Sequence, residues 1–336
     1  MKPTGNKDKK RRAVMLWVSG ALAVAAAAAI TLTVIFAGVP PLSVNGFELD
    51  DELYRYFVDT VRAAPEDYGL VENSPDSSII EEANQLAVEY AAVELQFAEK
   101  GAVLTAADKS TASKETNNLW RIFGDYYESI GVEKTTLMLV RENVAKSNVL
   151  FSLIYETGGS KAVSEKDLLA SFNKNYVVFR EFSDSFTTTN ELGEITAMTD
   201  AEKKALRTKF SNMVSQVQSG QSIDEIFSSY YDVNGQSLSD EVLGKNERSG
   251  YGDDFFAKVQ KITAGSTAVV ESGKEIHLVE RVAASKDAEY FWSYRLPALK
   301  ALKGEEYNKA FAEYVATLSV DESSGTQKRL ARRVLG

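Results

Sequence analysis

The chain has 336 residues, of which 44% are hydrophobic, and a formal net charge of −10. This length allows two domains with proper cores, and the apolar fraction excludes an intrinsically disordered chain. The sequence has no cysteine and a single histidine, His277. Disulfides, thiolate nucleophiles and cysteine-ligated metals are therefore excluded, and we expect neither a metal nor a cofactor.

Basic charge is concentrated at the N-terminus. Residues 1–12 hold six basic side chains and one acidic side chain, about +5, which leaves about −15 on the chain after Arg12. Nucleic-acid phosphates require a positive protein surface, so nucleic acid is excluded as a partner.

Residues 13–38 form an uncharged apolar run of 26 positions. A helix needs about 20 such residues to cross a bilayer, whereas the apolar region of a cleaved signal peptide has about 7–15. We therefore predict a transmembrane signal-anchor rather than a cleaved signal, and the lack of cysteine excludes a lipoprotein anchor. Basic residues 9–12 precede the run and the next basic residue is Arg55. The positive-inside rule then places the N-terminus in the cytoplasm and residues 40–336 outside it, in a single-pass membrane protein.

The chain after the apolar run predicts a short strand followed by a series of helices. Asn45-Gly46 inside residues 42–49 is a strong turn signal for a hairpin, and Asp50 is a good helix N-cap. Apolar residues at helical spacing predict a helix at 79–100. Further helices are expected from Thr105 to Gly131, at 133–157, and after Ser164.

The pattern changes at Tyr176, where β-branched and aromatic residues 176–182 predict a strand. Polar loops are expected at 183–198 and 232–252. The other elements expected in this part of the chain are helices at 199–219, 222–231 and 253–262 and strands at 267–270 and 275–282. Strand, helices and strands in this order predict a small α+β domain over residues 175–283.

The chain returns to a helix at 288–318, which Pro297 should kink or split. The basic tail, residues 321–336, is expected to be disordered or loosely docked. Residues 42–174 and 284–320 would then form one mainly helical lobe, interrupted by the α+β insert.

Several stretches in this order resemble the SurA/PrsA group of extracytoplasmic foldases. They are SVNGFELDDELYRYF (43–57), SEKDLLASFNKNYVVFREF (164–182), SGQSIDEIFSSYY (219–231) and FFAKVQKITAGSTAVVESGKEIHLVERV (255–282). In that group, N-terminal helices and a C-terminal helix form a chaperone lobe, into which a parvulin-type prolyl isomerase domain is inserted. The resemblance implies a chaperone or foldase that binds unfolded exported polypeptides, and it leaves the oligomeric state open.

The sequence departs from this group at the catalytic positions. Parvulin sites typically pair two histidines with a Cys or Asp beneath an apolar proline pocket. The first histidine position falls here on Phe179 or Arg180, and the second on Glu275. His277 lies two residues further along the strand and so points to the same face as Glu275. The catalytic candidates are therefore Arg180, Glu275 and His277, although a structural role for His277 is the commoner alternative.

Aromatic residues supply candidates for substrate binding. Phe179, Tyr251, Phe255 and Phe256 could line a proline-binding pocket or could be core residues. In the helical lobe, aromatic side chains could form a groove for clients or could be core. These are Tyr54, Tyr56, Phe57, Tyr90, Phe97, Trp120, Phe123, Tyr126, Tyr127, Phe151 and Tyr155.

Three functions remain open from the sequence. The first is a membrane-anchored chaperone or foldase whose prolyl isomerase activity is weak or lost. The second is an active peptidyl-prolyl cis-trans isomerase with a divergent site, since the reaction needs no covalent intermediate. The third is a non-catalytic adaptor of the cell envelope.

Overall fold

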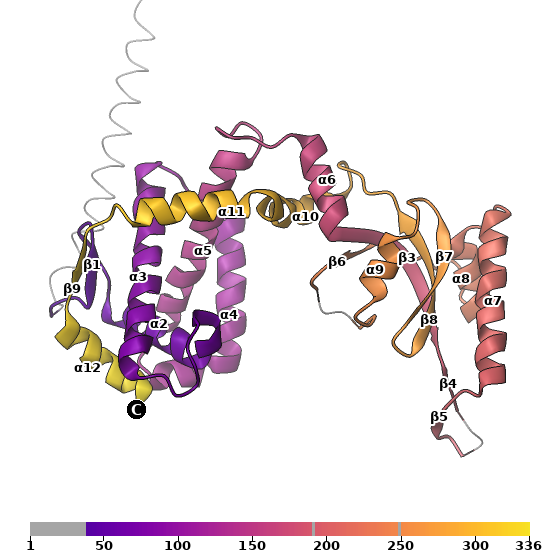
Figure 1. Ribbon diagram of the computed structural model, residues 1–336, viewed down its shortest axis with the longest axis horizontal. Coiled ribbons are helices and arrows are strands. Elements are labelled where there is room, and N and C mark those ends of the chain that lie inside the picture. The colour runs from indigo at the N-terminus through magenta and orange to yellow at the C-terminus, as the bar shows by residue number, and fades with distance from the viewer. Residues whose placement is uncertain (1–37, 190–191, 248–249) are drawn as a thin grey trace, which may run out of the picture. The chain divides into compact units, whose positions relative to one another are not determined.

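The computed structural model describes residues 38–189, 192–247 and 250–336 (Figure 1). The predicted basic segment 1–12 and nearly all of the predicted membrane segment 13–38 lie outside these residues. No helix within the described ranges is long and apolar enough to cross a membrane. Contacts divide the chain into two compact units. The first extends to Leu153 and resumes at Tyr307, and the second runs from Ile154 to Glu306.

A small sheet joins the two ends of the first unit. β1 (Leu42–Val44) and β2 (Phe47–Glu48) form an antiparallel hairpin. Asn45 and Gly46 have φ values of 46° and 81°, as a two-residue turn between twisted strands requires. The predicted hairpin is thus confirmed. β9 (Val320–Glu322) pairs with the other side of β1.

Four long helices make up most of the first unit: α2 (Asp51–Ala63), α3 (Asp76–Glu99), α4 (Ala106–Ser129) and α5 (Lys134–Tyr155). A 3-10 turn, η2 (Pro65–Tyr68), follows α2. The predicted N-caps are confirmed: Asp50 accepts from two backbone N–H groups of α2, and Thr105 forms a capping box with Asp108. Each cap satisfies backbone donors that a helix start would otherwise leave unpaired.

The expectation of a disordered or loosely docked tail is wrong. Residues Ser324–Leu335 form helix α12, and Leu330, Ala331 and Val334 are buried in the same core as α2 and α3. These three positions lie on one face of a helix whose other face is basic. The tail is polar overall, but this narrow apolar face is sufficient to dock the helix against the core.

The second unit is built around one antiparallel sheet with strand order β6-β3-β8-β7. Its strands are β3 (Tyr176–Ser185), β6 (Glu241–Gly244), β7 (Thr267–Ser272) and β8 (Glu275–Val282). Helix α9 (Phe255–Gln260) covers one face, while α7 (Asp200–Gln218) and α8 (Ile223–Tyr231) cover the other (Figure 1). The sheet therefore separates two cores, and alternate residues of each strand belong to different ones.

Two predicted loops contain strands. The first loop carries the hairpin β4 (Thr187–Thr189) and β5 (Ile195–Ala197), and the second contains β6. Both segments are rich in polar residues, so their composition gave no strand signal. β6 forms because β3 presents an unpaired edge beside it, which is a tertiary cause.

The division into units differs from the boundaries at 174/175 and 283/284 drawn from the sequence. Helix α6 (Glu165–Asn175) belongs to the second unit, together with α10 (Glu289–Ser293) and the first part of α11 (Arg295–Val315). Aromatic packing accounts for this: the Phe172 ring stacks on Tyr176 at 5.1 Å and meets Phe291 edge-on at 5.5 Å. The long C-terminal helix is split before Pro297, as expected. The α+β class predicted from the sequence is confirmed.

Candidate functional site

His277 lies in the middle of β8, directly opposite Ser183 of β3. Its side chain is fully buried. Nδ1 lies 2.9 Å from Oε2 of Glu181, and Nε2 lies 3.7 Å from Oε2 of Glu275. An ionised carboxylate only accepts hydrogen bonds, so the geometry places a proton on Nδ1. Nε2 has no hydrogen-bond partner in the described part of the chain.

Aromatic rings enclose this imidazole. The centroid of Phe255 lies 4.9 Å from that of His277, and the centroid of Tyr251 lies 5.8 Å away. Tyr251 stacks on Phe255 at 4.4 Å with an interplanar angle of 14°. Phe179 meets both rings edge-on at about 5.5 Å. We call Phe179, Tyr251, Phe255 and His277 the histidine cluster.

The histidine cluster is a packed arrangement. Phe179, Phe255 and His277 have no exposed surface, and Phe256 is buried in the same core. These rings fill the space over the sheet in which the sequence allowed a proline-binding pocket. Tyr251 closes the cluster on its half-exposed side.

Carboxylates surround the polar edge of the cluster. The Tyr251 hydroxyl donates to Oε2 of Glu241 on β6. Burial raises the pKa of the Tyr251 phenol, and the hydrogen bond to Glu241 and the charge of Glu181 raise it further. Glu275, His277, Glu181, Tyr251 and Glu241 thus form a chain of neighbouring polar groups across three strands. Its members can accept or hold protons, and none is a strong nucleophile.

Arg180 lies on the opposite face of the sheet. Adjacent strand residues point to opposite faces, and Phe179 and Glu181 face α9. The Arg180 guanidinium forms an ion pair with Asp240 at 2.6 Å, and that hydrogen bond raises its pKa. The structure therefore brings together Glu275, His277 and the four candidate aromatics, and it separates Arg180 from them.

Sequence reasoning missed the two carboxylates nearest to the cluster. Glu181 lies two residues after Phe179 and therefore shares its face, a signal that the alternation of the predicted strand contained. Glu241 lay in a segment interpreted as a loop. Within the described ranges, no group of three or more His, Cys, Asp or Glu residues is arranged to hold a metal ion.

The candidate aromatics of the predicted helical lobe divide into three groups by exposure. Six are buried: Tyr54, Phe57, Tyr90, Phe97, Phe151 and Tyr155. Tyr56, Trp120 and Tyr127 are half-buried, whereas Phe123 and Tyr126 are exposed. Sequence reasoning left open which of them face outward.

The exposed pair belongs to an apolar row on α4. Ile122, Phe123 and Tyr126 are 59%, 48% and 39% exposed, and they occupy positions i, i+1 and i+4 of the helix. We call these three residues the α4 row. The buried residues of α4 are small, namely Ala112, Thr116 and Gly124. The fully buried side chains of α4 are thus small, Leu119, Trp120 and Tyr127 pack half-buried against the core, and the α4 row is exposed to solvent.

No family model matches the sequence, and no curated protein does. Among solved structures, the foldase protein PrsA from Lactococcus lactis matches 88% of this chain and 99% of its own, with 11% identity and a TM-score of 0.37. The foldase protein PrsA from Streptococcus pneumoniae matches 83% of this chain and 87% of its own, with 10% identity and a TM-score of 0.33.

A structure described with the SurA-like chaperones of Campylobacter jejuni matches 85% of this chain and all of its own, with 11% identity and a TM-score of 0.29. The chain is thus similar to foldase proteins named PrsA and to a structure described with SurA-like chaperones.

Proposed function

We propose that this protein is a membrane-anchored extracytoplasmic chaperone or foldase that holds unfolded exported polypeptides. The observation that carries the proposal is the α4 row, where three large apolar side chains from one helix face solvent. Clustered exposed apolar residues are typical of surfaces that bind other polypeptides. The predicted anchor would keep this surface close to the membrane that clients cross.

The α4 row suits weak, reversible binding. Burying apolar surface contributes roughly 25 cal/mol per Å², so three partly exposed side chains supply only a modest free energy. Tyr126 is held in place because its hydroxyl donates to Asp59 and accepts from Arg62. A client therefore meets a preorganised ring and loses less entropy on binding.

The histidine cluster supports the view that prolyl isomerase activity is weak or lost. A prolyl ring needs an open apolar cleft, and the candidate aromatics Phe179 and Phe255 have no exposed surface. The imidazole beneath them is equally inaccessible. For a prolyl ring to reach the imidazole, Tyr251 would have to move away from Phe255 and break their stacked contact at 4.4 Å.

Aggregation of an unfolded client tests the proposal. The full chain should suppress light scattering by a chemically denatured client, and the double variant Ile122→Ser with Phe123→Ser should require several-fold more protein for the same effect. Asn118→Ser, an exposed change on the same helix, should behave like the original chain. Absence of any suppression by the original chain would reject the proposal.

Proline-limited refolding provides the second measurement. The full chain should accelerate the slow refolding phase of a proline-containing substrate little or not at all. Strong acceleration that Phe255→Ala abolishes while circular dichroism shows the variant still folded, and that Asn118→Ser leaves intact, would establish the isomerase instead.

A further inference from the structure

Strand β7 lies at one end of the four-stranded sheet. It pairs with β8 on one side and with no other strand in the described part of the chain. A strand at an edge presents N–H and C=O groups that another extended chain can pair with. β7 therefore has the topology of a strand that can accept a partner.

Two hydrogen bonds show which backbone groups of β7 point outward. The N–H of Arg281 on β8 donates to the carbonyl of Ser266 at 3.0 Å, so residue 266 faces β8. Successive residues of a strand direct their backbone groups to alternate sides, which turns those of 267, 269 and 271 away from β8. The Glu271 carbonyl accepts a hydrogen bond from Nζ of Lys258 and not from β8, which confirms that its backbone points outward.

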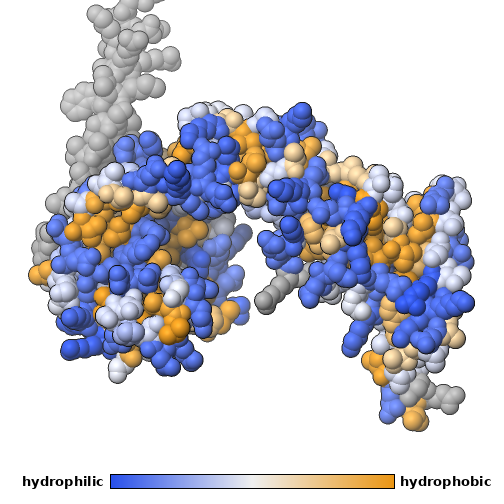
Figure 2. Space-filling view, in the orientation of Figure 1, coloured by the Kyte–Doolittle hydropathy of each residue, from blue (hydrophilic) through white to orange (hydrophobic). Residues whose placement is uncertain are grey.

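The edge borders a groove of about 680 Å³ between α7 and α9. Ala268, Val269 and Val270 of β7 line it, together with Ile262, Ser211, Arg207, Lys258, Lys261 and Glu271. Figure 2 shows apolar surface over β7 beside α7. Backbone groups, an apolar floor and polar walls therefore occur together along one strand.

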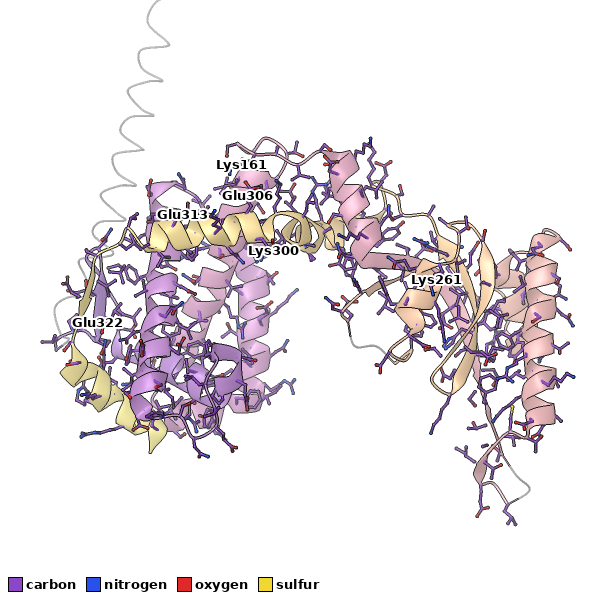
Figure 3. All side chains as sticks on the ribbon, in the orientation of Figure 1. Lys161, Lys261, Lys300, Glu306, Glu313 and Glu322 are labelled. Atoms are coloured by element: carbon purple, nitrogen blue, oxygen red, sulfur yellow. The ribbon has the colours of Figure 1, made fainter. Side chains whose placement is uncertain are left out.

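The walls of the groove carry three cationic side chains, Arg207, Lys258 and Lys261. Carboxylates pair with the first two, which leaves the charge of Lys261 unbalanced. Arg207 binds Glu271 through two hydrogen bonds of 2.7 and 2.8 Å, and Lys258 pairs with Asp254. Lys261, labelled in Figure 3, forms no ion pair with any described residue and is exposed. The chain outside residues 1–12 carries about −15, so an unpaired lysine beside a free strand edge favours an acidic ligand.

We propose that the free edge of β7 binds an extended, acidic segment of an unfolded polypeptide as a fifth strand of this sheet. Val269 and Thr267 would exchange backbone hydrogen bonds with the segment, and Lys261 would pair with its carboxylates. The inference rests on the proposed chaperone function, since it names the kind of segment that the chain takes. Lys258 protects only the Glu271 end of the edge, and no hydrogen bond from another described residue occupies the outward backbone groups of Thr267 and Val269.

Fluorescence anisotropy of labelled decapeptides with the full chain tests the inference. The probes are a peptide of alternating Val and Glu, the same peptide with Lys in place of Glu, and the acidic peptide with its backbone nitrogens methylated at alternate positions. Only the first should bind, and its affinity should fall as salt increases because exposed charges are screened.

Val269→Pro should abolish binding, because it removes the outward N–H from an edge position where proline is tolerated. Lys261→Glu should weaken binding about fivefold, as expected for reversal of one exposed charge. Lys245→Glu, which follows β6 at the other end of the same sheet, is the matched control and should bind normally. Circular dichroism and the melting temperature of each variant verify its fold.

The inference fails if the acidic peptide does not bind, if its methylated form binds equally well, or if Lys261→Glu and Lys245→Glu behave alike. If Val269→Pro does not fold, binding of the methylated peptide and binding by the Lys261→Glu variant still test the inference. Suppression of client aggregation by the α4 row is measured separately. If the acidic peptide does not bind but the chain still suppresses client aggregation, the β7 site is rejected and the chaperone function is kept.

Discussion

The histidine cluster and the α4 row are both aromatic, yet their side chains are used in opposite ways. In the histidine cluster, a sheet and helix α9 enclose Phe179 and Phe255 completely. On α4, the fully buried positions are small residues, and Ile122, Phe123 and Tyr126 are exposed to solvent. The difference teaches that aromatic content alone does not identify a binding surface in this protein. What matters is which side of each element is covered.

The largest effect should come from the core of the histidine cluster. Phe255→Ala should lower the free energy of unfolding by about 3–5 kcal/mol, because it removes a fully buried ring and leaves a cavity. Urea denaturation followed by circular dichroism measures this change. If Phe255→Ala lowers the free energy of unfolding by less than about 1 kcal/mol and instead changes client binding, the histidine cluster is not a structural core.

His277 should be a structural residue of the same cluster. His277→Leu should cost about 1–3 kcal/mol, because Glu181 then loses its partner at 2.9 Å. Adding Glu181→Leu should recover part of this loss, since removal of both partners leaves no unpaired buried group. Urea denaturation of both variants measures the coupling. A single variant as stable as the original chain would show that the pair contributes nothing.

The α4 row should contribute little to stability. Phe123→Ala, the matched counterpart of Phe255→Ala, should change the free energy of unfolding by no more than about 0.5 kcal/mol, since the ring is half exposed. The same urea titration measures it. A cost comparable to that of Phe255→Ala would mean that the row is core and would remove the basis of the proposed client surface.

Surface charge should have the smallest effect. Glu306 accepts from Lys161 and Lys303, and these hydrogen bonds lower its pKa from 4.5 to about 2 (Figure 3 labels Lys161 and Glu306). A carboxyl whose folded pKa is depressed stabilises the fold above its unfolded pKa and loses that contribution as pH falls toward the folded value. Glu306→Gln should therefore differ slightly from the original chain above pH 4.5 and converge with it near pH 2. Melting temperatures across this range test the convergence, and a difference that grows toward pH 2 would contradict it.

Local sequence signals predicted much of the fold. Asp50, Thr105 and Thr199 begin helices because each side chain caps backbone donors only two or three residues away. Asn45-Gly46 forms a hairpin because both residues tolerate positive φ. Signals of this kind act within a few residues and so can be read without the rest of the chain.

The candidate site was predictable only in part. The period-two alternation of β8 placed Glu275 and His277 on one face, and the structure has them there. Arg180 and Phe179 were alternatives for one position, and the pairing of β3 with β8 assigns them to opposite faces. Glu241 joined the site through a strand that exists because β3 offered it an edge.

The sequence by itself determined where most helices and strands begin and end, because caps, turns and periodicity are local. The tertiary structure alone decided which aromatics are covered, that α12 docks through Leu330, Ala331 and Val334, and that β7 remains at an edge. Burial depends on what packs against a residue, and the packing partners come from distant parts of the chain. Two phenylalanines of equal hydrophobicity, Phe123 and Phe255, therefore end in solvent and in the core.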